Sequence, residues 1–378
     1  MTMRVLYLVH DLEDAAVRRR TLMLEAGGAS VYLAGFRRGP KPVSESTDKI
    51  IDLGETRNGA FAHRAAKTLT TAPSLIRALG DSKPDIIIAR NLEMLFLARQ
   101  VARRFKPAPV IVYESLDIHR LLLRRDFIGA LLRGAERSLM SRASLVVTSS
   151  PAFVENYFVP MQNLTLPVFL LENKVLDLSG RVVGVPAAKK TDGVITIGWF
   201  GALRCRKSLD LLSALTRLMA GRVKVVMRGK PAYNEFEDFD AQVAAEPHIT
   251  FEGPYSAEDL SALYAAVDLT WAIDFFEEGQ NSKWLLPNRL YEGSRYGSVP
   301  IAMSGTETGS FVSRHGLGLT LDEATPQALM ALFETLTPDC LSALRATLKA
   351  CPPSLFTATR DDCVGFVDRL KTLQVAHA

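Results

Sequence analysis

Three cationic side chains follow one apolar run in the second half of the chain. The run and the turn after it, residues 198–208, read GWFGALRCRKS. We expect the strand to end at Gly201 and a helix to begin near Lys207. Backbone N–H groups at the start of a helix attract anions, and Arg204, Arg206 and Lys207 would add positive charge and donors. The stretch therefore predicts a diphosphate-binding site, with a solvated basic turn as the alternative.

A carboxylate lies in a short helix farther along the chain. Residues 288–309 read NRLYEGSRYGSVPIAMSGTETG, which predicts a helix over 288–296, a stop at Gly297 and a buried strand over 299–303. Glu292 would then lie at the carboxyl-end crevice, where open parallel sheets bind ligands. The alternative is a solvated helix residue with no ligand.

The rest of the sequence narrows the class of protein. No GxxxxGK[ST] loop is present, and the first strand leads into HDLED rather than GxGxxG, which argues against NAD. The four cysteines form no CxxC pair and the six histidines no HExxH pair, so we expect neither a metal site nor a cofactor. No apolar run reaches the ~18 residues needed to span a bilayer. The run over residues 5–9 is too short for a signal peptide, so we expect a cytoplasmic protein.

Charge is distributed unevenly along the 378 residues. Residues 1–180 contain 25 Lys and Arg against 18 Asp and Glu, whereas the remainder contains 20 against 23, and the net charge is +4. A basic first half beside a mildly acidic second half suggests different partners for the two halves. The excess is too small for a nucleic-acid-binding protein, and no RNA- or DNA-binding motif is present.

Alternating strands and helices would position these residues. Short apolar, β-branched runs predict buried parallel strands, and the stretches between them predict helices, so we expect right-handed βαβ units in an α/β, doubly wound sheet. In the first half the expected strands are residues 4–9, 30–34, 50–53, 85–89, 110–113, 145–148 and 168–171, and the expected helices are 14–26, 92–105 and 118–143. In the second half the expected strands are 194–200, 223–228, 249–252, 269–273 and 299–303, and the expected helices are 207–220, 257–267 and 288–296.

A polar stretch without periodicity separates the two halves. Residues 181–193 predict a linker between an N-terminal Rossmann-like domain, 1–180, and a C-terminal one, 194–355. A final helical segment within 356–378 could pack back on the first domain. Two such domains would face one another across a cleft, where bilobed folds usually bind small molecules.

The second half resembles the donor-binding domain of GT-B glycosyltransferases, with glycosyltransferase family 4 and bacterial exopolysaccharide (succinoglycan-type) enzymes the most similar. The motifs are IGWFGALRCRKSLDLL, ITFEGPYSAEDLSALYAAVDLTWAI and NSKWLLPNRLYEGSRYGSVPIA. RVLYLVHDLED, VIVYESLDIHR and SLVVTSSPAFVENY extend the resemblance over nearly the whole chain. It implies a GT-B fold and transfer of a sugar from an NDP-sugar, with a UDP-sugar favoured.

The resemblance also implies roles for individual residues. Glu292 would accept hydrogen bonds from the ribose hydroxyls, and Arg204 and Lys207 would neutralise the diphosphate leaving group. Gly201 would let the backbone approach that diphosphate. The remaining donor-site candidates are Gly253 and Tyr255 beside the base, and Asn288, Thr306 and Gly309 near the phosphates or the sugar.

One position departs from the family pattern. Many members carry two Glu separated by seven residues, but the position eight before Glu292 is Trp284. Glu278 would be the displaced counterpart that contacts the transferred sugar, and Asn281 and Lys283 are alternatives.

Bond cleavage leaves negative charge on the nucleoside diphosphate, which fixed cations and helix dipoles stabilise, so no metal is required. If the reaction inverts configuration, a general base must take the acceptor proton. The candidates at strand ends of the first half are Asp11, Glu114, Asp117 and His119. If configuration is retained, these residues would instead bind the acceptor. Helix caps and hydrogen-bonding core residues are the alternative interpretation.

The stretch of residues 119–137 is basic and rich in Leu, and it predicts an amphipathic helix. Such helices can lie on anionic membranes at the inner face of the cell membrane, where polyprenyl-diphosphate-linked saccharide acceptors are found in enzymes of the resembled group. The alternative is that the apolar side packs on the sheet. For the whole chain, the competing functions are a GT-B-like sugar-nucleotide 2-epimerase and a non-catalytic bilobed sugar-binding protein.

Overall fold

The computed structural model describes residues 2–37, 49–56, 71–80, 82–180 and 193–377. The chain divides into two compact units. Unit 1 comprises Met1–Glu172, Leu176–Gly180 and Ala358–Ala378, and unit 2 comprises Asn173–Val175 and Arg181–Thr357. Of the linker expected over 181–193, only Gly193 lies within the described residues.

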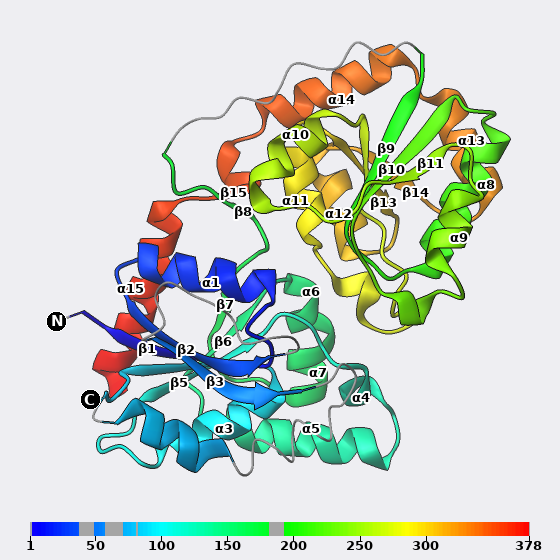
Figure 1. The fold of residues 1–378 in the computed structure, drawn as a ribbon. Helices are drawn as coiled ribbons and strands as arrows, with labels where there is room; N and C mark the ends of the chain where they lie inside the picture. Colours follow the sequence, from blue (N-terminus) through cyan, green and yellow to red (C-terminus); the bar gives the residue numbers. More distant parts are fainter. Residues whose placement is uncertain (1, 38–48, 57–70, 81, 181–192, 378) are drawn as a thin grey trace. The chain divides into compact units, whose positions relative to one another are not determined.

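Unit 1 is built on a parallel sheet (Figure 1). In the described residues its seven strands have the order β3-β2-β1-β4-β5-β6-β7, and the first six follow the Rossmann arrangement. The strands expected from the sequence are all present, with ends shifted by at most three residues. They are β1 (Arg4–Val9), β2 (Ser30–Arg37), β3 (Ile50–Glu55), β4 (Ile86–Arg90), β5 (Val110–Ser115), β6 (Leu145–Thr148) and β7 (Val168–Leu170).

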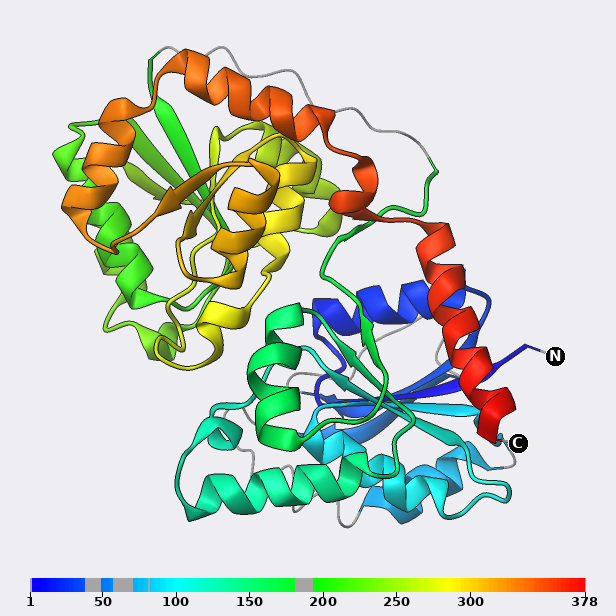
Figure 2. The same cartoon turned by 180° about the vertical axis from the view of Figure 1, so that it is seen from behind.

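Helices cover both faces of this sheet (Figures 1 and 2), which explains why its central strands are apolar without alternation. Helices α1 (Ala15–Ala26) and α15 (Arg360–His377) lie on one face, and α3 (Leu92–Ala102) and α5 (Phe127–Met140) on the other. Phe366 of α15 is fully buried with Tyr7 of β1 in one core cluster. The C-terminal helix is therefore part of unit 1. The shorter helices include residues 71–79, α4 (Arg120–Leu123), α6 (Pro151–Phe153), the π-helix Val154–Phe158 and α7 (Val159–Gln162).

The single helix expected over residues 118–143 is wrong, because the chain breaks between α4 and α5. Asp126 has an extended backbone, and its Oδ1 accepts a hydrogen bond from the Gly129 N–H at 3.0 Å. An aspartate in this position starts a new helix by capping its free N–H groups. The break turns a long helix into a corner followed by a separate 14-residue helix.

Unit 2 contains a second parallel sheet with the order β11-β10-β9-β12-β13-β14 in the described residues. Its strands are β9 (Ile195–Leu203), β10 (Val223–Pro231), β11 (Ile249–Phe251), β12 (Leu269–Trp271), β13 (Val299–Met303) and β14 (Leu319–Leu321). Its α-helices are α8 (Arg206–Leu218), α9 (Phe239–Ala244), α10 (Leu260–Ala265), α11 (Asn288–Arg295), α12 (Glu307–His315), α13 (Pro326–Thr335) and α14 (Pro338–Ala350). Its 3₁₀ turns are Tyr233–Glu235, Ala257–Asp259, Asn281–Trp284 and Pro353–Leu355.

Two short strands, β8 (Val175–Leu176) and β15 (Thr357–Ala358), pair where the chain passes between the units. No helix of the described residues has the length and apolar character needed to cross a membrane.

Candidate functional site

The basic turn of unit 2 starts later than the sequence suggested. Strand β9 continues to Leu203 rather than ending at Gly201, and α8 begins at Arg206. Cys205 caps the helix, because its Sγ accepts from the Ser208 N–H at 3.4 Å. The Ser208 hydroxyl in turn accepts from the buried Trp271 indole at 3.1 Å. Contacts of Ser208 with the buried Cys205 and Trp271 therefore hold the first turn of α8 in place.

Two of the three cations in this turn converge on one segment. The Nη2 of Arg204 lies 3.7 Å from Oδ2 of Asp274, and its guanidinium lies 4.4 Å from the centre of the Phe276 ring. The Nζ of Lys207 lies 2.7 Å from Oε1 of Glu278. Both positive groups thus lie beside residues 274–278, where aromatic faces and carboxylates hold them.

Arg206, in contrast, points elsewhere. Its Nη1 lies 3.0 Å from Oε1 of Glu237, and both side chains are more than half exposed. The structure therefore does not bring Arg206 together with the other two cations.

A pocket of 480 Å³ lies at the carboxyl ends of β12, β13 and β14. Four candidates from the sequence line it: Lys207, Glu278, Lys283 and Thr306. Asp274 also lines it, although the sequence did not single it out. Lys207 is the residue that the basic turn contributes to its lining.

Glu292 lies in a second cluster, with two tyrosines. The buried Tyr264 hydroxyl donates to Oε2 of Glu292 at 2.9 Å. Burial, and then the charge of Glu292, raises the pKa of Tyr264 well above its usual value. The pKa of Tyr255 is raised for the same two reasons. Both phenols therefore stay neutral near Glu292, and the Tyr264 hydroxyl is a donor to it.

The backbone beside Tyr255 is bare. Gly201 and Gly229 pair across β9 and β10 with φ of 111° and 139°, which side chains rarely adopt. A Cβ on Gly229 would lie 1.8 Å from the Gly201 oxygen, and one on Gly201 would lie 3.9 Å from the Tyr255 hydroxyl. Gly253 joins this group, because its oxygen accepts from the Gly229 N–H at 2.9 Å. Gly229 thus lets the two strands lie close together, and at Gly201 no side chain covers the main chain.

Arg289 connects the pocket to the Glu292 cluster, and sequence reasoning missed it. Its Nη2 lies 3.5 Å from Oδ2 of Asp274 and donates to the Ile273 oxygen at 2.8 Å. The buried Nε has no hydrogen-bond partner among the described residues. Arg289 precedes Glu292 by three positions on α11, a spacing that places both on one helix face and could have identified it.

The remaining donor-side candidates are Thr306, Gly309, Asn281 and Asn288. The first two have a role in the local fold. Thr306 caps α12 by accepting from the Gly309 N–H at 3.0 Å. A Cβ on Gly309 would lie 2.1 Å from the Met303 oxygen, so this glycine permits close packing of α12 on β13. Asn281 is buried in a 3₁₀ turn, and Asn288 is exposed at the start of α11.

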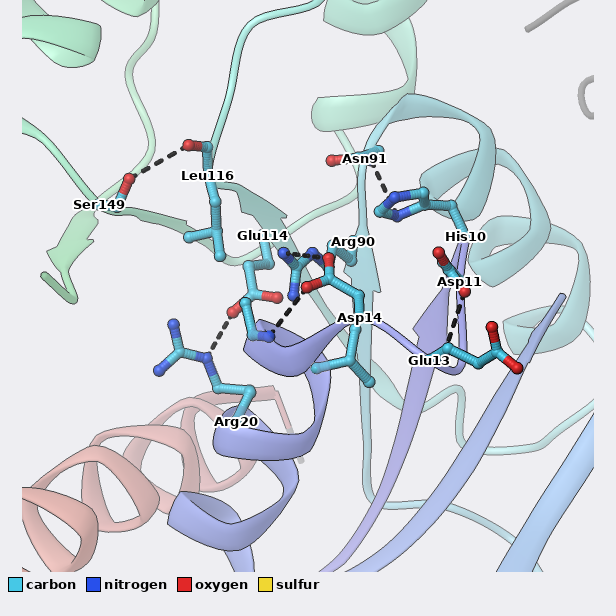
Figure 3. Close-up of polar contacts among 12 residues, drawn as sticks. His10, Asp11, Glu13, Asp14, Arg20, Arg90, Asn91, Glu114, Leu116 and Ser149 are labelled. Carbon is cyan, nitrogen blue, oxygen red and sulfur yellow. Dashed lines mark hydrogen bonds and ion pairs between the residues drawn. The ribbon is translucent and has the colours of Figure 1, made fainter. Parts of the chain in front are cut away.

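At the corresponding edge of unit 1, Glu114 is buried in an ionic network (Figure 3). The Nε of Arg20 lies 2.6 Å from its Oε1, and the Tyr7 hydroxyl donates to its Oε2. Burial alone would raise the pKa of Glu114, but the charges of Arg20 and Arg90 outweigh it and lower the pKa. Glu114 is therefore an internal counter-ion rather than a base open to an acceptor.

Two residues of this edge that the sequence did not single out are His10 and Asn91 (Figure 3). The Asn91 Nδ2 lies 3.2 Å from the His10 Nδ1. Asn91 has φ 74° and ψ 168°, a backbone conformation that is nearly restricted to glycine. Beside them Asp11 is buried, and its Oδ1 accepts from the Glu13 N–H at 3.0 Å.

Asp117 and His119 line a small pocket of 100 Å³ together with Asn91 and Glu93. Both candidates are exposed, and the His119 Nδ1 accepts from the Leu121 N–H at 3.3 Å. The structure therefore brings Asp117 and His119 together at the carboxyl edge of unit 1. Among the residues that the structure describes, no group of three or more His, Cys, Asp or Glu is arranged to hold a metal ion.

The two parallel sheets, each with polar residues at its carboxyl edge, define an α/β protein of the GT-B type. Residues 7–165 match the model of the glycosyl transferase 4-like domain. The chain is 51% identical to the succinoglycan biosynthesis protein ExoL of Rhizobium meliloti (strain 1021), an alignment that covers 98% of this chain and 94% of the relative. The chain therefore belongs to the glycosyl transferase 4-like family and is a glycosyltransferase.

Solved structures share the fold at low sequence identity. A sucrose-phosphate synthase from Thermosynechococcus elongatus has a TM-score of 0.75 at 12% identity, with both chains fully covered. Alr3699/HepE from Anabaena, solved with UDP and glucose, has a TM-score of 0.67 at 15% identity over 99% of this chain and 100% of its own. These similarities support the GT-B fold and nothing finer.

Proposed function

We propose that the protein transfers a sugar from a UDP-sugar to a saccharide acceptor linked to polyprenyl diphosphate, in the synthesis of an exopolysaccharide. The 51% identity to a succinoglycan biosynthesis protein supports the pathway, and the UDP in the HepE structure supports the donor. The observation that carries the donor site is the convergence of Arg204 and Lys207 beside the 480 Å³ pocket, with Arg289 behind it.

In this proposal Lys207 exchanges its carboxylate partner for the diphosphate. Lys207 and Glu278 are 41% and 51% exposed, and such surface pairs are worth only ~0–1 kcal/mol. Two phosphate oxygens would offer Lys207 and Arg204 stronger, charge-assisted hydrogen bonds. Glu278, once released, would be available to the hydroxyls of the transferred sugar, with Lys283 and Asn281 as the neighbouring alternatives.

The nucleoside would lie over the bare backbone beside Glu292. Glu292 keeps acceptor capacity beyond the Tyr264 hydroxyl, so it can accept from both ribose hydroxyls. Tyr255 and the turn at Gly253 would lie beside the base. Arg204, Lys207 and Arg289 would stabilise the charge that develops on the diphosphate, and we infer that they fill the role that a metal plays elsewhere.

Unit 1 would present the acceptor. We assign to it Asp117 and His119, which line the 100 Å³ pocket, and Asp11, which follows β1. If the reaction inverts configuration, one of them takes the proton of the acceptor hydroxyl; if it retains configuration, they position that hydroxyl. An acceptor of this kind lies at the inner membrane face, so a peripheral contact of the basic unit 1 with that membrane belongs to the proposal.

Nucleotide binding and transfer test this function. Titration with UDP should give saturable binding, and Glu292→Ala should weaken it by ~1–3 kcal/mol, the scale of lost hydrogen bonds to a charged group. Glu334→Ala, at an exposed position of α13, is the matched control and should bind UDP as the wild type does. Unchanged UDP affinity in folded Glu292→Ala would remove Glu292 from the site. Sugar transfer to a lipid-linked acceptor in the presence of EDTA tests the metal independence.

A further inference from the structure

The first half of helix α5 turns its large apolar side chains to solvent. Phe127, Ile128 and Leu131 are 80%, 48% and 61% exposed, whereas the buried residues of the helix are Gly129, Glu136 and Met140. The other exposed large apolar side chains of the described residues are scattered over the chain. The sequence left open the alternative that the apolar side of this helix packs on the sheet. Part of the apolar side of α5 does not pack there.

A polar anchor holds the inner side of α5 instead. The carboxylate of Glu136 is fully buried and accepts from the Tyr113 hydroxyl at 2.6 Å. The Tyr157 hydroxyl and the Gln162 amide donate to its other oxygen. These contacts fix the rotation of the helix about its axis. The rotation that they select leaves Phe127, Ile128 and Leu131 outside.

The corner before α5 is braced as well. The Nη1 of Arg133 donates to the Leu122 oxygen at 2.7 Å and to the Arg124 oxygen at 2.6 Å. A Cβ on Gly129 would lie 2.1 Å from the Arg124 oxygen, so the two segments are in close contact. The exposed apolar side chains thus project from a preorganised corner, which lowers the entropy cost of burying them against a partner.

Exposed cations lie on the same segments as this apolar group. Arg120, Arg124, Arg125 and Arg137 are exposed along α4, the corner and α5. The one exposed acid of this stretch is Asp126, which caps α5 and pairs with Arg124. Exposed apolar side chains with exposed arginines in the same segments match an anionic lipid surface, where the apolar side chains enter the acyl boundary and the guanidinium groups meet lipid phosphates.

We propose that this surface, Phe127, Ile128 and Leu131 with the exposed arginines of α4, the corner and α5, docks unit 1 on an anionic phospholipid bilayer with α5 lying in the membrane plane. The inference rests on the proposed lipid-linked acceptor. A helix of 14 residues is about 21 Å long, too short for the ~30 Å hydrocarbon core, so it lies on the membrane rather than across it. Leu121, Leu122 and Leu132 of the same corner line the pocket of Asp117 and His119. Docking would therefore hold that pocket beside the lipid headgroups.

Co-sedimentation of the full chain with vesicles tests the surface. We expect binding to phosphatidylcholine vesicles that contain phosphatidylglycerol, and weaker binding to phosphatidylcholine alone. The triple variant Phe127→Ser, Ile128→Ser, Leu131→Ser should reduce partitioning by about fivefold to tenfold for each side chain, or on the order of 100-fold or more in total. Val375→Ser, which alters a side chain of α15 that is also 80% exposed, is the matched control and should leave partitioning unchanged.

A charge variant separates the two contributions. Arg124→Gln with Arg125→Gln should weaken binding to the anionic vesicles about fivefold for each arginine and have little effect on neutral ones. Wild-type protein that stays in the supernatant at low salt, or a triple variant that binds as the wild type does, overturns the proposal. A wild-type dimer that the triple variant dissociates in sedimentation velocity also overturns it, because the surface would then be covered by a second copy.

UDP titration and transfer in detergent keep this test apart from the proposed function. The protein could bind UDP and transfer sugar to a detergent-solubilised acceptor but fail to bind vesicles. That result would overturn the docking surface alone. Alternatively, the protein could bind vesicles through Phe127, Ile128 and Leu131 but show no affinity for UDP. That result would overturn the proposed donor instead.

Discussion

The two units place charged side chains at the same edge of similar sheets but treat them differently. In unit 1, Glu114 and Arg20 are 0% and 5% exposed and are enclosed with Tyr7 and Arg90. In unit 2, Lys207 and Glu278 form a half-exposed pair. A buried, multiply partnered charge cannot leave its site without a large desolvation cost, whereas a surface pair exchanges partners readily. The first arrangement builds the scaffold, and the second suits a site that exchanges ligands.

The backbones at the two edges differ as well. Unit 2 has Gly201 and Gly229 where φ is strongly positive, and at Gly201 the space beside the main chain is open to a ligand. Unit 1 keeps a side chain, Asn91, in a conformation that glycine would adopt at less cost. Its amide reaches His10 at the end of the first strand. Unit 1 thus retains strain in order to place a polar side chain.

The largest expected effect is at the buried pair. Glu114→Gln leaves the Arg20 guanidinium buried without its counter-ion, and we expect the free energy of unfolding to fall by ~3–5 kcal/mol. Denaturant unfolding measures this loss. Glu155→Gln, at an exposed position, is the control and should change it by less than ~0.5 kcal/mol. A loss below ~1 kcal/mol would show that the unit 1 network contributes no more to the free energy of unfolding than a surface ion pair does.

The same variant gives a signed pH dependence. Because the pKa of Glu114 is lower in the folded than in the unfolded chain, its contribution to stability is fully present above the unfolded value, about 4.3. That contribution is lost as the pH falls through the folded pKa. The gap between wild type and Glu114→Gln should therefore be widest near neutrality and should narrow in acid. A gap that widens in acid would contradict the assigned ion pair.

A smaller effect is expected at Asn91. Asn91→Ala and Asn91→Gly both remove the contact with His10, but only glycine relieves the backbone. We expect Asn91→Gly to be more stable than Asn91→Ala by about 1–2 kcal/mol, after the entropy cost of glycine is taken into account. Ala331→Gly in the exposed face of α13 is the control with the opposite sign and should lose ~0.5–1 kcal/mol. Equal stability of the two Asn91 variants would mean that the backbone is unstrained.

The sequence predicted the architecture because burial in a parallel sheet leaves a local signature. Strands β1, β6 and β13 have the predicted bounds, since each is a short apolar run between polar turns. The prediction missed β14, whose LTL is too short to form a pattern. It also joined α4 to α5, because helical periodicity continues through residues 124–126 and the capping by Asp126 is visible only in three dimensions.

Site residues were predicted less completely than elements, because partners that lie far apart in the chain decide their surroundings. Arg204 and Arg206 look equivalent in the sequence, yet one meets Asp274 and the other Glu237. In the sequence Glu114 looks like any carboxylate at a strand end. Its ion pair with Arg20, 94 positions away in the chain, is visible only in the structure. Residue type and spacing identify candidates, whereas charge pairing and burial decide which of them face a ligand.

The smallest expected effect concerns the exposed pair of unit 2. Glu278→Gln should change the free energy of unfolding by no more than ~1 kcal/mol, and added salt should remove most of that change, because half-exposed charges are screened by water and ions. Unfolding at low and high salt measures it. A loss of ~3 kcal/mol that persists at high salt would place Lys207 and Glu278 in the same class as Arg20 and Glu114. Lys207 would then be committed to the fold, and its exchange onto a diphosphate would cost more than the new hydrogen bonds could offset.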